Sequence, residues 1–133
     1  MSGAVEHVVQ VRWQDLDGLG HVNHAVVLTY LEEGRDSFLR VHAIPRDEYV
    51  VGRCSVSFNG EIDPGQASVT VSCGLRELGR KSLKTEERIV DASGEAVVEA
   101  EFDLVLWDPR ERRSRLITDA ERASLTPTEV VGG

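Results

Sequence analysis

Hydrophobic and polar residues alternate along five segments of the chain, which is the pattern typical of half-buried β-strands. The first segment, residues 5–13, places one set of side chains on a common face: Val5, His7, Val9, Val11 and Trp13. The other four are residues 50–59, 66–77, 81–90 and 96–107. The last of these is a long strand whose inward face carries Val98, Ala100, Phe102, Leu104 and Leu106. The chain therefore predicts five strands, four of them following one another after a single interruption.

That interruption has the period of a helix, from about residue 24 to residue 40. One face carries residues at steps of four, three and four, namely Val27, Leu31, Gly34 and Phe38. A glycine inside a helix costs about 1 kcal/mol relative to alanine, so Gly34 predicts close approach of the helix to a sheet. Asn23 suits the N-cap position, and Pro45 follows the end of the helix.

Short connections join the last four strands, with turn sequences at residues 62–65 and 91–94. Short connections require antiparallel pairing, and one apolar helix beside one sheet is an α+β arrangement. We expect a single domain over residues 1–133, with a short C-terminal helix capped near residues 118–121 and a loose tail. One helix covers only part of such a sheet, so a free edge and face predict at least a dimer.

Composition narrows the functional classes. The 133 residues are 41% hydrophobic and 29% charged, and the net charge of −8 is unfavourable for nucleic-acid binding. No apolar run approaches the roughly 20 residues that span a bilayer, and the N-terminus lacks the features of a signal peptide, so a cytoplasmic protein is expected. Cys54 and Cys73 lie within alternating strands and are expected to be small buried hydrophobes.

The segment that suggests chemistry runs from Asp15 to His24, just before the predicted helix. A helix N-terminus offers unpaired N–H groups and partial positive charge, and a nearby carboxylate adds a nucleophile or base. Together these groups meet the requirements of acyl transfer. Aspartates before a helix are also ordinary caps, and histidines in this loop are also ordinary polar residues. The loop permits a metal site, but no zinc-like spacing is present, and no serine or cysteine nucleophile motif lies nearby.

The motif D-x-D-x-x-G-H-V-N-H at residues 15–24, followed by Tyr30-Leu31-Glu32-Glu33, resembles the 4-hydroxybenzoyl-CoA thioesterase family. The turn Asp63-Pro64-Gly65, the segment 78–82 and the order of the elements are similar as well. The resemblance implies a hotdog fold, in which a five-stranded antiparallel sheet wraps around one long helix. It also implies an acyl-CoA thioesterase that assembles as a homodimer or a homotetramer.

By this resemblance the catalytic carboxylate is Asp17, and the backbone N–H of His24 polarises the thioester carbonyl. Asp15 is expected to hold the loop. Relatives often carry tyrosine where this chain has Trp13 and Asn23, which makes a tyrosine-assisted step doubtful here. Coenzyme A would lie along a dimer interface, as part of the substrate and with no further cofactor. The implied substrate-binding residues are Asn23, Gly65, Arg80, Lys81, Ser82 and Lys84.

Several alternatives stay open on the sequence. Asp17 could attack the thioester or activate water, and an acyl carrier protein could present the acyl group in place of coenzyme A. The chain could also be a non-catalytic acyl-CoA-binding protein or a hotdog dehydratase. The preferred acyl group is not readable from the sequence.

Overall fold

The structure is a computed structural model that describes residues 2–63 and 65–126. Its elements follow in the order β1 (Ser2–Gln10), the 3-10 helix η1 (Trp13–Asp15), α1 (His24–Val41), β2 (Tyr49–Phe58), β3 (Ser68–Leu78), β4 (Ser82–Val90), β5 (Ala96–Asp108), β6 (Arg113–Ser114) and α2 (Asp119–Leu125). The predicted order of one strand, one helix and four strands is therefore confirmed.

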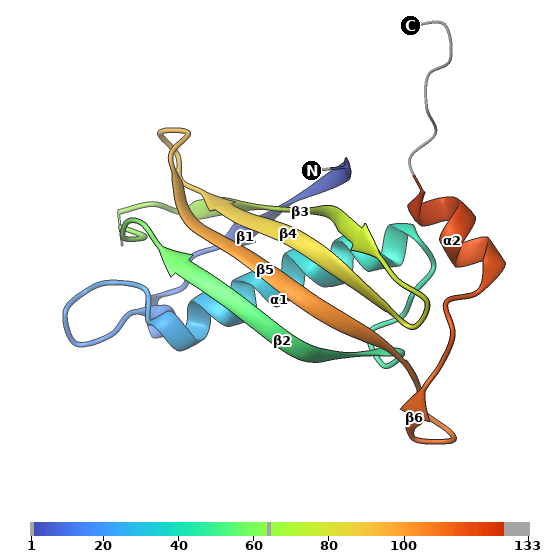
Figure 1. The fold of residues 1–133 in the computed structure, drawn as a ribbon. Coiled ribbons are helices and arrows are strands. Elements are labelled where there is room, and N and C mark those ends of the chain that lie inside the picture. The colour runs from blue at the N-terminus through green and yellow to red at the C-terminus, as the bar shows by residue number, and fades with distance from the viewer. Residues whose placement is uncertain (1, 64, 127–133) are drawn as a thin grey trace, which may run out of the picture.

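The strands form one antiparallel sheet in the order β1-β3-β4-β5-β2, and the two-residue strand β6 pairs with the end of β5. The sheet curves around α1, and β2 forms one of its edges (Figure 1). The predicted α+β hotdog architecture is confirmed, with β6 as a small addition that alternation did not reveal. Neither α1 nor α2 combines the length and the apolar character that a bilayer-spanning helix needs.

Helix α1 packs mainly on β1, β3 and β4, and its predicted apolar face is buried. The contact is closest at Gly34, where a Cβ atom would lie 2.3 Å from Cγ1 of Val71 on β3. The absence of a side chain at Gly34 is therefore what lets the helix lie this close to the sheet. The predicted close approach is confirmed.

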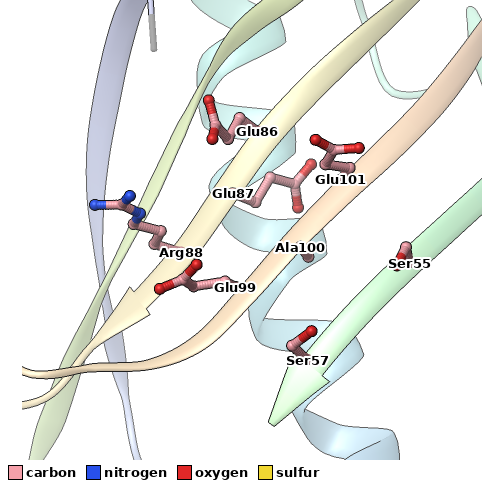
Figure 2. A pocket seen from close by; sticks show the side chains of 8 residues that line it. All are labelled: Ser55, Ser57, Glu86, Glu87, Arg88, Glu99, Ala100 and Glu101. Atoms are coloured by element: carbon pink, nitrogen blue, oxygen red, sulfur yellow. The ribbon is translucent and has the colours of Figure 1, made fainter. Parts of the chain in front are cut away.

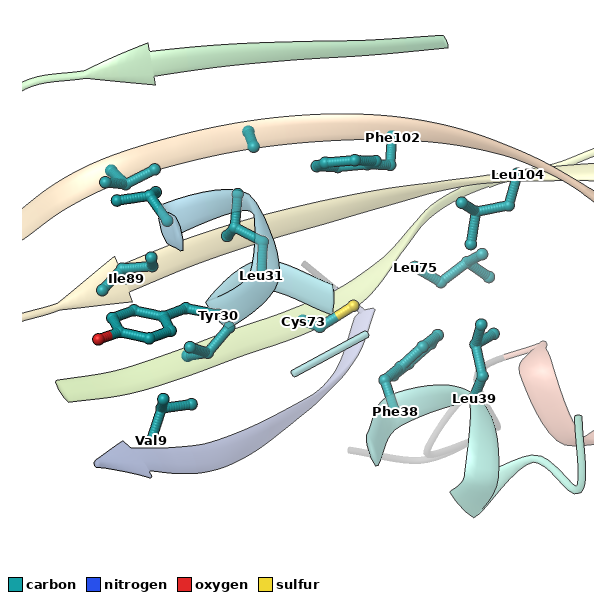
Figure 3. Close-up of a cluster of buried hydrophobic side chains, with 14 of the residues drawn as sticks. Val9, Tyr30, Leu31, Phe38, Leu39, Cys73, Leu75, Ile89, Phe102 and Leu104 are labelled. Carbon is teal, nitrogen blue, oxygen red and sulfur yellow. The ribbon is translucent and has the colours of Figure 1, made fainter. Parts of the chain in front are cut away.

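The core between α1 and the sheet contains aromatic and aliphatic side chains from both layers, including Tyr30, Leu31 and Phe38 of the helix (Figure 3). It also holds an ion pair. Arg35 donates from Nε to Oε2 of Glu87 at 3.0 Å, and both side chains are almost fully buried. The guanidinium carbon also lies 3.7 Å from the centre of the Phe102 ring. A charge this deep is tolerated because its partner and its hydrogen bonds are provided inside the fold.

Two predictions about individual residues are corrected by the structure, and a third concerns residues that it does not describe. The first strand ends at Gln10, and Trp13 lies in η1 with 86% of its surface exposed, because the chain turns away from the sheet before reaching it. Cys73 is buried as predicted, whereas Cys54 is exposed, because it lies on the edge strand β2, which α1 contacts only weakly. Thr118 caps α2 as predicted, and the predicted tail at residues 127–133 lies outside the described residues.

Gly34→Ala tests the close approach. The added methyl group would overlap Val71, and overpacking of this kind typically costs about 1–3 kcal/mol, against about 1 kcal/mol gained from helix propensity. We expect a lower free energy of unfolding in urea. Combining it with Val71→Ala, which removes the atom at 2.3 Å, should recover part of the loss relative to Val71→Ala alone. If Gly34→Ala lowered the free energy of unfolding equally in the native chain and in Val71→Ala, a contact other than Val71 would be responsible.

Candidate active site

Helix α1 begins at His24, with an amide that has no hydrogen-bond partner among the described residues. Asn23 caps the helix as predicted: its side-chain oxygen accepts from the N–H of Ala25 at 2.8 Å. The backbone carbonyl of Asn23 accepts from the N–H groups of Val26 and Val27. The N–H of His24 is thus left as a donor at the positive end of the helix dipole, which favours an oxyanion.

Asp17 lies in a tight loop just before this helix. Its Oδ1 atom accepts from the backbone N–H of Leu19 at 2.8 Å and from that of His21 at 3.2 Å. These two hydrogen bonds favour the carboxylate and hold the pKa of Asp17 below its usual range. Asp17 is therefore ionised at neutral pH, the state that a nucleophile or general base needs. Oδ2 has no hydrogen bond within the described part of the chain.

Asp15 lies two residues earlier in a different environment. Its side chain is buried and accepts hydrogen bonds from the Tyr30 hydroxyl at 2.5 Å and from the backbone and side chain of Arg12. Burial alone would raise the pKa of Asp15, but the hydrogen bonds from Tyr30 and Arg12 outweigh burial and lower it. These contacts fit the structural role that the sequence suggested.

Asp17 and His24 line the same cavity, which has a volume of about 260 Å³. Its apolar wall comes from the loop before α1, from α1 itself, from the end of β2, from the β2–β3 connection and from β5: Leu19, Val22, Val27, Phe58, Ile62 and Val98. The imidazole of His24 stacks on the Phe58 ring with 4.2 Å between the ring centres. A carboxylate, an unbonded amide and an apolar wall thus meet at one place, an arrangement suited to binding an acyl group next to a nucleophile or base.

Sequence reasoning missed the contribution of the β2–β3 connection to this cavity. Glu61 and Ile62 line it, and Oε2 of Glu61 lies 3.2 Å from Nε2 of His21. The alternation of residues 50–59 gives no sign that Phe58 contacts His24, because that contact depends on where β2 ends relative to α1. No spacing in the sequence relates residues from two loops that lie about 40 positions apart.

The predicted substrate-binding residues fall into two groups. Asn23 is beside His24, and Gly65 lies in the β2–β3 connection at the same end of the sheet, where its N–H donates to Asp63. The other four, Arg80, Lys81, Ser82 and Lys84, lie in or just after the β3–β4 turn at the opposite end (Figure 1). Strand β3 connects the two ends over 11 residues, roughly 35 Å. One subunit therefore does not bring the two groups together.

The basic residues of the second group differ in their partners. Nζ of Lys84 lies 3.7 Å from Oδ1 of Asp103, so part of the positive charge of Lys84 is already balanced. Arg80 and Lys81 are exposed and have no ion pair among the described residues. These two are the freer candidates for contact with phosphate.

A second depression, of about 210 Å³, is lined by residues of β2, β4 and β5 (Figure 2). Its side chains are mostly charged or hydroxylated, among them Glu86, Arg88, Glu99 and Glu101. Such walls do not suit an acyl chain, which needs apolar surface. Within the described residues, no cluster of three or more histidine, cysteine, aspartate or glutamate side chains is arranged to hold a metal ion.

The sequence itself matches a protein family. The model of the thioesterase-like superfamily matches residues 11–130, which is most of the chain. The chain belongs to the thioesterase-like superfamily. This membership confirms the prediction of a thioester hydrolase, whereas the finer resemblance to 4-hydroxybenzoyl-CoA thioesterases stays a prediction. No curated protein matches this chain.

Solved structures agree with the fold and the family. A thioesterase from Thermus thermophilus, complexed with coenzyme A and Zn, is 32% identical with a TM-score of 0.80, and the match covers 90% of each chain. A predicted thioesterase from Bacillus stearothermophilus is 25% identical with a TM-score of 0.83, and the match covers 92% of this chain and 94% of the other. A DHNA-CoA thioesterase from Staphylococcus aureus shares the fold at 14% identity, with a TM-score of 0.76 and coverage of 86% and 80%.

The environment of Asp15 predicts a pH dependence of stability. Because the folded pKa of Asp15 is lowered, its stabilisation is fully present above the unfolded pKa of about 3.9 and is lost as pH falls through the folded pKa. In urea unfolding, Asp15→Asn should therefore cost stability at pH 7, and the difference from the native chain should shrink below about pH 4. Asp47→Asn, at an exposed carboxylate without a described partner, is the control and should change little. A difference that stayed constant with pH would contradict a stabilising role for the charge.

Proposed function

We propose that this protein hydrolyses acyl-CoA thioesters to a free acid and coenzyme A. The observation that carries the proposal is the meeting of the Asp17 carboxylate and the unbonded N–H of His24 on one apolar cavity. A thioester carbonyl placed against the His24 N–H would be polarised, and the helix terminus would stabilise the negative charge that develops on oxygen. The coenzyme A bound to the Thermus thermophilus thioesterase supports coenzyme A as the thiol carrier.

Two routes use these groups. In the first, Asp17 attacks the carbonyl carbon, the C–S bond breaks, and the CoA thiolate leaves and takes a proton from water. Water then hydrolyses the resulting anhydride and restores the carboxylate. In the second, Asp17 takes a proton from water as the oxygen of that water attacks the carbonyl. The C–S bond then breaks, and the leaving thiolate takes this proton from Asp17, which restores the carboxylate. Both routes need Asp17 ionised, which its hydrogen bonds favour.

Asp17→Asn separates the catalytic role of Asp17 from the structural role of Asp15. An amide can neither attack nor take a proton, so kcat should fall by at least the roughly 10²–10⁴-fold typical of acid–base groups. Because Asp17 is partly exposed, the melting temperature of this variant should change little. Asp15→Asn should show a smaller rate loss together with a lower melting temperature. If Asp15→Asn abolished turnover at native stability while Asp17→Asn stayed active, the two roles would have to be exchanged.

The edge strand β2 supports assembly into a dimer. No described strand pairs with its outer edge, and its apolar side chains are exposed, with Val51 at 46% and Phe58 at 42%. Antiparallel pairing of two β2 strands would cover this edge and would reverse one sheet relative to the other. The partner subunit's β3–β4 turn would then lie at the same end of the assembly as Asp17. This arrangement would bring together the two groups of residues that one subunit separates.

We therefore expect the native chain to be a dimer or a dimer of dimers by light scattering at micromolar concentration. Val51→Asp places a charge on the exposed apolar face of β2 and should produce monomers with reduced turnover. Val8→Asp is the matched control, because Val8 is exposed on β1 at the other edge, and it should leave the assembly unchanged. A stable native monomer with full activity would rule out an active site that needs the partner.

The β3–β4 turn is tested with Arg80→Ala, Lys81→Ala and Lys84→Ala. If these cations contact the phosphates of coenzyme A, each substitution should raise KM with little change in kcat. Higher salt should raise the KM of the native enzyme, because ions screen exposed charges. Arg76→Ala, at an exposed cation on the neighbouring strand β3 that pairs with Glu101, is the control. An unchanged KM in all three variants would make the turn an ordinary solvated surface.

A further inference from the structure

Two loops meet beside the cavity that holds Asp17. One is the loop before α1, which contains His21, and the other is the β2–β3 connection, which contains Glu61. Nε2 of His21 lies 3.2 Å from Oε2 of Glu61, and both residues line the cavity. This contact links the side chains of the two loops.

His21 is also bonded to Asp17 through its backbone. The N–H of Asp17 donates to the carbonyl of His21 at 2.7 Å, and the N–H of His21 donates to Oδ1 of Asp17 at 3.2 Å. An antiparallel bridge between Leu16 and Val22 closes the loop outside these bonds. The His21 backbone, together with the N–H of Leu19, therefore holds the Asp17 carboxylate in place.

We infer that the His21–Glu61 pair is a clasp that fixes the loop before α1 and so positions the Asp17 carboxylate in the cavity. His21 and Glu61 are positioning residues in this assignment, since they act through Asp17. The inference rests on the proposed thioester hydrolysis for its effect on rate. Its effect on the geometry of the loop does not depend on any activity.

The exposure of the pair indicates where its effect should be found. The side chains of His21 and Glu61 are 38% and 69% exposed, and contacts in such surroundings add little to global stability. Loss of the clasp should therefore leave the melting temperature nearly unchanged. Its cost should appear locally, as a less well placed Asp17 and a lower kcat. A residue with only a structural role would show the opposite pattern.

Besides Glu61, other titratable groups lie near His21. Asp17 and His24 also line the cavity, and Asp17 accepts a hydrogen bond from the backbone N–H of His21. A variant that only removes charge can therefore alter Asp17 in two ways at once. For this reason the test compares Glu61→Gln, which keeps a hydrogen-bonding group, with Glu61→Ala, which removes it.

The kinetic test measures kcat, KM and melting temperature with an acyl-CoA that the native chain hydrolyses. Glu61→Ala should lower kcat about fivefold with little change in KM, and Glu61→Gln should lie between it and the native chain. His21→Asn combined with Glu61→Ala should cost no more than the worse single variant, because both remove the same link. Glu101→Ala breaks an ion pair of similar exposure with Arg76 and should leave kcat unchanged. If the fold-reductions in kcat of the two single variants multiplied in the double variant, the clasp would be overturned.

A second measurement needs no turnover. The backbone amides of Asp17 and His21 donate within the loop, so their hydrogen exchange, followed by NMR, reports whether the loop stays closed. Exchange at both amides should be several-fold faster in Glu61→Ala than in the native chain, and unchanged in Glu101→Ala. Unchanged exchange in Glu61→Ala would overturn the clasp, whatever the kinetics. If exchange is faster in Glu61→Ala but the native chain hydrolyses no acyl-CoA, the clasp is supported and the proposed function is overturned.

Discussion

The closeness of α1 to the sheet at Gly34 is the constraint on which the rest of the structure depends. With a Cβ at this position, the helix could not lie where it does against Val71. Because the helix lies so deep, the next residue, Arg35, is buried as well and requires the carboxylate of Glu87. The tight contact and the buried ion pair are thus two consequences of one packing distance. The pair also restricts how α1 can slide or rotate, because Glu87 is fixed on strand β4.

The same helix positions the candidate active site. Tyr30, one turn before Gly34, donates to Asp15 and holds η1 against the helix. Asp17 lies two residues after Asp15, and His24 is the first residue of α1. The positions of Asp17 and His24 therefore depend on where the helix begins. The two aspartates illustrate how surroundings decide a role. Asp15 is buried with its oxygens occupied, whereas Asp17 is partly exposed beside a cavity.

The placement of α1 over β1, β3 and β4 also determines what is left uncovered. Within the described residues, no strand pairs with the outer edge of β2, and some of its apolar side chains are exposed. Both features are unfavourable in water unless another surface covers them. The proposed dimer covers that edge and explains why basic residues of the β3–β4 turn lie so far from Asp17 within one subunit. A stability requirement and a functional requirement would then be met by the same contact.

Much of this protein was determined by the sequence alone. Alternation and helical periodicity predicted the order of the elements, and Asn23 predicted the cap, because these properties depend on residues near one another in the chain. Gly34 predicted that the helix approaches the sheet closely, but not that Val71 is the residue it meets. The contiguous motif from Asp15 to His24 likewise predicted which end of α1 the candidate active site lies at. Only the tertiary structure decided the exposure of Trp13 and Cys54, the Arg35–Glu87 pair, and the meeting of Phe58 and Glu61 with the loop before α1. These features join segments that are distant in sequence, and the curvature and register of the sheet, which no local pattern encodes, determine which of them come into contact.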